Sequence, residues 1–208
     1  MNKALIPQQQ RSIEKKEKII EAGIQLMKEK GYYNVTTTEI TNLAGVSTGI
    51  CYRYFNNKLD ILTAALTSII DNTFHPLTEQ LIKMSSPISV QAFTSFIKVL
   101  LDQLCTMHES LGILHNDLEA LQHSEPVIAK FLYEIEAKLL MQFSDIFTKS
   151  EVEIRHPNEK IYITYNLIEG FCHKKIFHHT NSVDINILYK ETINTIIFLI
   201  FSDRGRIP

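Results

Sequence analysis

Glycine and proline are scarce in this sequence, with only seven glycines and six prolines among 208 residues. Apolar residues recur mostly at a spacing of three to four, and clean alternation of apolar and polar residues is rare, so helices are predicted throughout. No run reaches the roughly 18 apolar residues that a membrane span needs, because Asn194 and Thr195 interrupt the nearest candidate, 193–201. The sequence therefore predicts an all-α protein of about nine helices that does not bind a membrane.

Cysteine is also scarce. Cys51, Cys105 and Cys172 are widely spaced and form no CxxC pair, so neither a disulfide framework nor a zinc site is predicted. Residues 1–11 are rich in Gln and basic residues and lack the apolar stretch of a secretory signal, so we expect a disordered arm there and a cytoplasmic protein. We predict no catalytic residue, no metal and no cofactor.

Acidic residues slightly outnumber basic ones, and the net charge of -2 alone would not suggest a nucleic-acid partner. The charge is unevenly distributed, however. Residues 1–60 contain nine Lys and Arg against six Asp and Glu, whereas the remainder contains twelve against seventeen. The N-terminal part is therefore the basic part, and it is where a nucleic-acid interface is expected.

Helix start and stop signals are dense between residues 12 and 60. A first helix is predicted over about 13–30, capped by Ser12. Thr36 and Glu39 form a capping box and Val35 with Ile40 a hydrophobic staple, which predicts a short helix over about 37–43. We place the N-terminal domain at 12–60 and a larger domain at 61–208.

A second short helix follows closely. Gly45 predicts a tight turn, Ser47 a cap for a helix running to about Phe55, and Lys58 the start of a fourth helix. Two short helices joined by such a turn form a helix-turn-helix unit, whose second helix enters the DNA major groove. The same hairpin occurs in proteins that never bind DNA, so this geometry alone leaves the partner open.

The second helix of the pair offers polar groups on one side. Four residues are expected to point outwards and together form a surface that we call the reading face: Thr48, Gly49, Tyr52 and Arg53. Arg53 carries the paired donors that suit guanine, and Gly49 allows the backbone to approach DNA closely. Lys58 adds a phosphate contact at a helix N-terminus.

The stretch 19–66 resembles the DNA-binding domain of the TetR/AcrR family of bacterial regulators. The resemblance rests on Gly31-Tyr32, the segment 36–40, Ala44-Gly45-Val46-Ser47, Tyr52, Tyr54-Phe55 and Lys58. It implies that Thr36, Thr48, Tyr52, Tyr54 and Lys58 contact DNA, mostly at phosphates. The full predicted DNA-binding set is Thr36, Thr37, Thr38, Ser47, Thr48, Gly49, Ile50, Tyr52, Arg53, Tyr54 and Lys58.

The sequence departs from the family pattern at four positions. Members often have a basic residue at the positions of Thr38 and Thr48, Thr at that of Ile50, and Ala at that of Thr41. These differences put fewer charges on the reading face and leave the operator sequence open.

The larger domain is expected to dimerise and to bind a small molecule. Helices predicted over about 158–179 and 184–202 are unusually apolar, and the resemblance implies that they form a four-helix bundle in a homodimer bound to a palindromic operator. It also implies a pocket for a small hydrophobic effector in the middle helices. The candidate lining residues are Phe96, Leu100, Leu104, Met107, His115, Glu119, Phe131, Phe143 and Tyr165.

Two other functions are considered. A helical metal enzyme of the di-iron type requires an ExxH pair on each of two helices, which the sequence does not supply. A helical adaptor that binds proteins and no specific DNA remains open. The favoured prediction is a ligand-responsive regulator, with repression the expected sign because the resembled family mostly blocks promoters.

Overall fold

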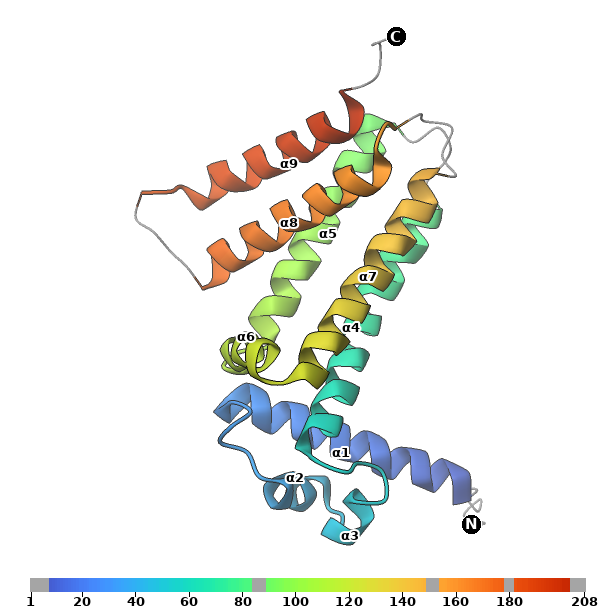
Figure 1. The fold of residues 1–208 in the computed structure, drawn as a ribbon, viewed down its shortest axis with the longest axis vertical. Helices are drawn as coiled ribbons and strands as arrows, with labels where there is room; N and C mark the ends of the chain where they lie inside the picture. Colours follow the sequence, from blue (N-terminus) through green and yellow to red (C-terminus); the bar gives the residue numbers. More distant parts are fainter. Residues whose placement is uncertain (1–7, 84–88, 149–153, 178–181, 203–208) are drawn as a thin grey trace, which may run out of the picture. The chain divides into compact units, whose positions relative to one another are not determined.

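The computed structural model describes residues 8–83, 89–148, 154–177 and 182–202, and no strand occurs among them. The nine helices of this described part are shown in Figure 1. Their bounds are α1 Gln8–Lys30, α2 Thr37–Ala44, α3 Thr48–Cys51, α4 Lys58–Ile82, α5 Val90–Ser110, α6 Leu114–Ser124, α7 Pro126–Thr148, α8 Pro157–Ile176 and α9 Ile185–Phe201. The predicted all-α class is confirmed.

The start of α1 differs from expectation. α1 begins at Gln8, so the predictions of a disordered arm through residue 11 and of a cap at Ser12 were wrong for the described residues 8–12. Helix α4 continues through Pro76 to Ile82. Proline lacks an amide hydrogen, so within this helix the carbonyl of Asn72 loses its usual donor.

The chain divides into two compact units. The first comprises residues 1–71 and 111–131, and the second comprises 72–110 and 132–208. Helices α4 and α7 each contribute residues to both units. A single boundary at residue 60 does not anticipate that α6 belongs to the first unit. The division into domains at residue 60 stays a proposal.

The first unit is built on α1, which packs against α2 and α6, while α2 packs against α3. Its interior contains fully buried apolar side chains from these helices and from α4, among them Ile19, Met27, Ile40, Cys51 and Ile61. The start of α6 is fastened to the end of α1, because the Ile113 N–H donates to the Lys28 carbonyl at 3.2 Å.

Tyr32, just beyond α1, is the point where three helices of the first unit are fastened together. Its backbone N–H donates to Asp117 Oδ2 of α6 at 2.5 Å. Its carbonyl accepts from the Lys58 ammonium of α4 at 2.5 Å, and that ammonium lies 4.0 Å from the centre of the Tyr32 ring. The aromatic ring is itself buried.

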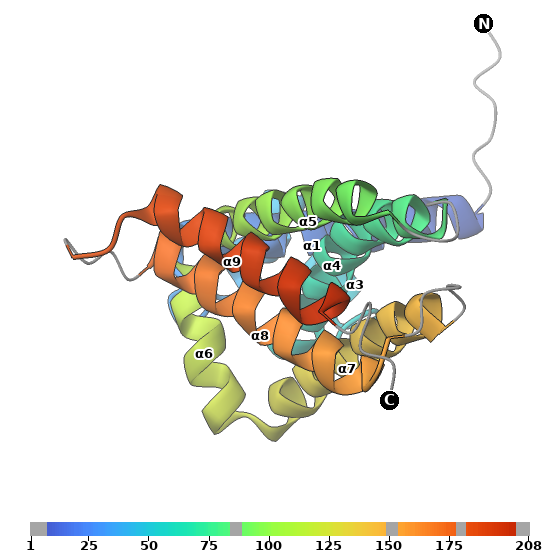
Figure 2. The ribbon, with the colours of Figure 1, turned by 90° about the horizontal axis from the view of Figure 1, so that it is seen from above.

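The second unit is organised by α5, which packs against α8 and α9. Helices α8 and α9 run antiparallel beside each other in Figures 1 and 2. Aromatic contacts join them to each other and to α5: Phe171 to Tyr189 with ring centres 5.6 Å apart, and Phe93 to Phe201 at 5.4 Å. Among the described residues, no helix combines the length and apolar character needed to cross a membrane.

Candidate nucleic-acid interface

The N-terminus of α2 is fixed by reciprocal capping. The Glu39 N–H donates to Thr36 Oγ1 at 3.2 Å, and Glu39 Oε2 accepts from the Thr36 N–H at 2.9 Å. Lys30 also contacts Glu39 at 2.9 Å, and this contact together with the bonds from Thr36 lowers the pKa of Glu39 to about 2. The predicted capping box is confirmed, and Val35 and Ile40 of the predicted staple are both buried.

The turn between α2 and α3 follows from two residues. Gly45 has φ 66°, a left-handed conformation that glycine adopts without steric cost. Ser47 then caps α3 by accepting from the Ile50 N–H at 3.3 Å. Residues 45–49 also match the GxSxG spacing of a hydrolase nucleophile, but that motif needs a preceding strand, and here Ser47 follows a helix.

The regular part of α3 is shorter than predicted. It covers four residues, Thr48–Cys51, whereas the sequence suggested a helix to about Phe55. The backbone still turns in the helical sense, because Tyr54 and Phe55 both donate to the Cys51 carbonyl, at 2.9 and 3.0 Å. The side chains of Cys51 and Phe55 are buried, which anchors this extra turn to the core.

The reading face is exposed in the structure. All four of its residues, Thr48, Gly49, Tyr52 and Arg53, lie on the surface, and the Tyr52 side chain is 55% exposed. A Cβ added at Gly49 would meet nothing within 4 Å, so packing within the free protein does not require a glycine there. These four residues are therefore accessible at the start of α3 and in the turn after it.

The remaining predicted DNA-binding residues fall into two groups. Thr36, Thr38 and Ser47 are exposed at the starts of α2 and α3, and Thr37 and Ile50 are half-buried. Tyr54 is also half-buried, and its hydroxyl lies 2.8 Å from Ser12 Oγ of α1. That contact joins α1 to the turn after α3, and the sequence pattern did not reveal it because the two residues are 42 positions apart.

Lys58 is held within the protein to an extent that the sequence did not suggest. Besides the Tyr32 carbonyl, its ammonium donates to the Val35 carbonyl at 2.7 Å. Burial lowers the pKa of Lys58, while the charges of Asp117 and Glu39 act in the opposite direction. Lys58 therefore ties the start of α4 to the loop before α2.

The predicted effector-binding residues do not all come together. A cavity of about 50 Å³ in the second unit is lined by apolar side chains from α4, α5, α7, α8 and α9. Five predicted residues line it: Phe96, Leu100, Leu104, Phe143 and Tyr165. Met107 is half-buried elsewhere in the second unit, and His115, Glu119 and Phe131 belong to the first unit.

Thr164 is a lining residue that sequence reasoning missed. Its Oγ1 is buried and has no hydrogen-bond partner among the described residues. The neighbouring Tyr165 has a raised pKa, first through burial and then through the negative charges of Glu169 and Glu136. The cavity thus combines an apolar wall with one hydroxyl group available for a polar atom.

Comparison with known proteins finds similarity to bacterial regulators. Residues 19–77 match the sequence profile of "Bacterial regulatory proteins, tetR family". The HTH-type transcriptional regulator HbdR of Aromatoleum sp. (strain CIB) is 30% identical over 113 residues, which are 52% of this chain and 49% of the relative. The chain thus spans about half the length of that curated relative.

Solved structures share the fold along most of the chain. A putative TetR-family transcriptional regulator from Mesorhizobium loti MAFF303099 has a TM-score of 0.69 at 19% identity, covering 91% of this chain and 96% of its own. A putative transcriptional regulator from Saccharomonospora viridis, crystallised in complex with choline, has a TM-score of 0.68 at 16% identity, covering 88% and 96%. At these identities the likeness concerns the fold.

The contacts of Lys58 predict a loss of stability when its charge is removed. In Lys58→Met, two carbonyls lose a charged donor, so we expect the free energy of unfolding to fall by about 1–3 kcal/mol in urea denaturation. Lys83→Met is the matched control, because Lys83 is 75% exposed and contacts only Glu79, at 3.4 Å, among the contacts described. An unchanged stability in Lys58→Met would contradict this structural role.

Proposed function

We propose that this chain, whose residues 19–77 match the sequence profile of the tetR family of bacterial regulatory proteins, represses transcription as a homodimer on a palindromic operator. In this proposal a small hydrophobic effector releases the DNA. The profile match of residues 19–77 and the fold shared with TetR-family regulators support this proposal. Repression, the palindrome, the dimer and the effector are the proposed parts.

The observation that carries the proposal is the exposed reading face above a tightly packed α2–α3 pair. A helix fits the major groove, which is about 12 Å wide, and its N-terminal residues contact base edges. Arg53 is suited to pair with guanine O6 and N7, and Thr48 to contact a base edge or a thymine methyl group. The open space around Gly49 is then occupied by DNA.

The flanking residues would position the chain on the phosphates. Thr36, Thr38 and Ser47 present hydroxyl groups at the N-termini of α2 and α3, where backbone N–H groups also favour an anion. Thr37, Ile50 and Tyr54 lie behind this row and are proposed to support or extend it. Lys58 ties the start of α4 to the loop before α2 and has one further N–H for a phosphate, beyond the two bonds described.

A homodimer is supported by apolar side chains left exposed on α8 and α9. Tyr162 and Ile163 of α8 are 53% and 45% exposed, and Ile187 and Phe198 of α9 are 58% and 74% exposed. Ile187 and Phe198 are eleven residues apart, which puts them on one side of the helix. The opposite side, including Ile193, Ile196 and Ile200, is buried within the second unit.

The cavity of the second unit supports an apolar effector with a small polar group. Its walls are almost entirely hydrocarbon, and the Thr164 hydroxyl lines it. At about 50 Å³ the cavity is far smaller than the roughly 300 Å³ or more of a typical ligand site, so binding requires its side chains to move apart. That movement is what would link ligand binding to a change in shape.

Release of DNA requires the effector to bind more tightly to a form whose reading faces are wrongly spaced. Helix α4 begins at Lys58 in the first unit and continues past Asn72 into the second. We propose that effector binding tilts α4. The tilt would move Arg53 and its dimer mate away from successive major grooves, which are about 34 Å apart.

The proposed reading role of Arg53 predicts a sequence-selective defect. DNA sites selected from a random pool by the intact protein should share a palindrome, and Arg53→Ala should lose about 1–3 kcal/mol of discrimination at one base pair per half-site in fluorescence anisotropy. Arg155→Ala, which removes the same charge from an exposed site in the second unit, should bind as the intact protein does. Failure to enrich any site would favour the adaptor function instead.

The proposed dimer predicts a monomer when its apolar surface is charged. Phe198→Glu should sediment as a monomer at concentrations where the intact chain is a dimer, because a carboxylate in an apolar interface loses its hydration. Tyr133→Glu is the control, since Tyr133 is a 70% exposed aromatic residue of α7. A dimer that persists in Phe198→Glu would refute the α8–α9 interface.

The proposed effector site predicts that filling the cavity blocks the response. A long-chain alcohol such as 1-decanol, with one hydroxyl on a hydrocarbon chain, should bind in calorimetric titration and weaken DNA binding. Leu100→Trp should bind DNA normally but bind 1-decanol at least about tenfold more weakly, since the indole occupies the cavity. Met141→Trp, at a 62% exposed position, should respond normally, and equal responses of both variants would exclude this cavity.

A further inference from the structure

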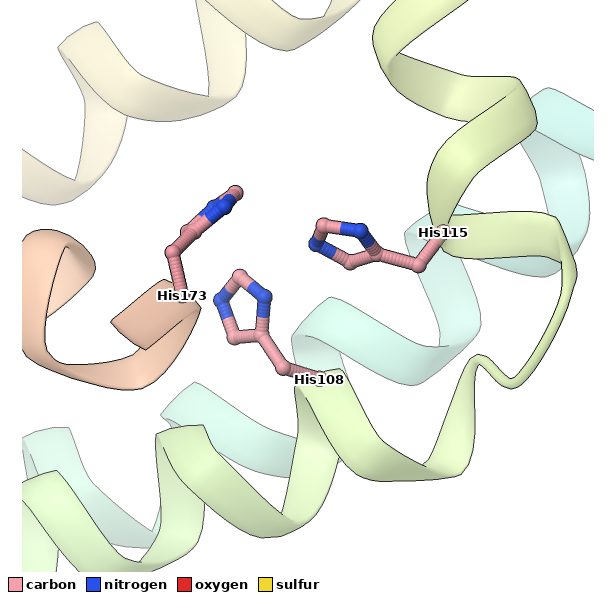
Figure 3. A group of neighbouring side chains, drawn as sticks. All are labelled: His108, His115 and His173. Atoms are coloured by element: carbon pink, nitrogen blue, oxygen red, sulfur yellow. The ribbon is translucent and has the colours of Figure 1, made fainter. Parts of the chain in front are cut away.

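Two histidines and a glutamate of the second unit meet where α5 packs against α8. His108 lies in the last turn of α5, and Glu169 and His173 lie one turn apart on α8. Figure 3 shows the His108 and His173 rings approaching each other from these two helices, with ring centres 5.3 Å apart. His115, also drawn there, belongs to the first unit and is not counted among these three residues.

One ring nitrogen of each histidine lies close to the Glu169 carboxylate. His108 Nε2 lies 3.3 Å from Glu169 Oε2, and His173 Nε2 lies 3.8 Å from the same oxygen. A ring nitrogen of His108 and one of His173 are within 4.8 Å of each other. His108 Nε2 and His173 Nε2, from two neighbouring helices, therefore both lie within 3.8 Å of one carboxylate oxygen.

These separations suit a shared metal ion. A tetrahedral ion bound at about 2.0–2.2 Å to nitrogen and oxygen holds its ligand atoms roughly 3.3–3.6 Å apart. Of the two contacts to Glu169 Oε2, the one at 3.3 Å lies within that range and the one at 3.8 Å is slightly longer. Two imidazoles and one carboxylate also match the ligand chemistry of zinc and its neighbours.

The surroundings favour a cation as well. His108 is only 7% exposed, and the Glu169 and His173 side chains are 23% and 31% exposed, so a carboxylate is partly withdrawn from water here. His108 and His173 both lie in C-terminal turns, where unsatisfied carbonyls give a helix end its negative potential. An ion at this place would compensate the Glu169 charge and that potential together.

We propose that His108, Glu169 and His173 bind one divalent transition-metal ion of the zinc class, with a fourth position left for water or another ligand. The group is distinct from the apolar effector cavity, whose lining residues include none of the three. The proposal does not depend on the DNA-binding function, because metal binding is measured without DNA. It replaces the expectation from sequence that the chain binds no metal.

The test uses the full chain, stripped of metal with a chelator, and Zn²⁺ or Co²⁺ as the probe. We expect one Zn²⁺ per chain in calorimetric titration and, with Co²⁺, the visible absorption of a tetrahedral site. Glu169→Gln and His173→Ala should each weaken binding by about 100-fold or more, since even outer partners of metal ligands are worth 10–100-fold.

His75→Ala is the matched control. His75 and Glu79 form an exposed pair four residues apart on α4, 3.8 Å from each other, so the same residue types occur there without a third ligand among the described residues. Its affinity for Zn²⁺ should equal that of the intact chain. Glu169→Gln keeps the shape of the side chain, so it remains informative if a histidine variant loses helical circular dichroism.

The cysteine pair beside the site provides a second readout. Cys105 and Cys172 are buried in the same two helices with their sulfur atoms 3.2 Å apart. A site built from nitrogen and oxygen should show no sulfur-to-cobalt charge-transfer band. Strong charge-transfer absorption, absence of stoichiometric binding, or equal affinity of His173→Ala and His75→Ala would each overturn the proposal.

Discussion

The backbone of Tyr32 is held between two opposite charges. The Asp117 carboxylate accepts its N–H, and the Lys58 ammonium donates to its carbonyl and to that of Val35. Hydrogen bonds to charged groups are stronger than those between neutral groups, and they are directional. The packing of the first unit depends on these contacts of Tyr32, because they join the loop after α1 to both α4 and α6.

Contacts within the first unit also bear on the proposed DNA contacts. Lys58, Tyr54 and Glu39 each make contacts within this unit, whereas Thr36, Thr38, Ser47 and the reading face are exposed. Arg53 is then the main cationic group on the reading face itself. Sequence selectivity and general attraction to phosphate are therefore expected to depend on different residues.

Features encoded within a few neighbouring residues were predictable from the sequence. The capping box of Thr36 and Glu39, the turn at Gly45 and the cap at Ser47 each depend on interactions over three to five positions, and the structure confirms them. Contacts between distant residues were not predictable in this way. Lys58 looked like a free cation because nothing in its local sequence indicates the carbonyls of Tyr32 and Val35.

The same distinction explains the candidate sites. Helical spacing identified apolar positions such as Phe96 and Leu100, but it could not indicate that Met107 would miss the cavity or that Thr164 would line it. Of the proposed metal ligands, Glu169 and His173 lie four positions apart in the sequence, a spacing that does not by itself predict a metal site. His108 is supplied by another helix, 61 positions away from Glu169, so only the packing of α5 on α8 brings the three together.

The first unit is discontinuous along the chain, since residues 111–131 complete what residues 1–71 begin. Consider a recombinant gene with a single crossover near residue 71. Its product would combine the Tyr32 loop of another protein with the α6 of this chain. The incoming loop would then need an acidic partner at position 117 that evolved in a different protein. The unit that carries the reading face is therefore encoded by two separate stretches of the gene, which must be inherited together.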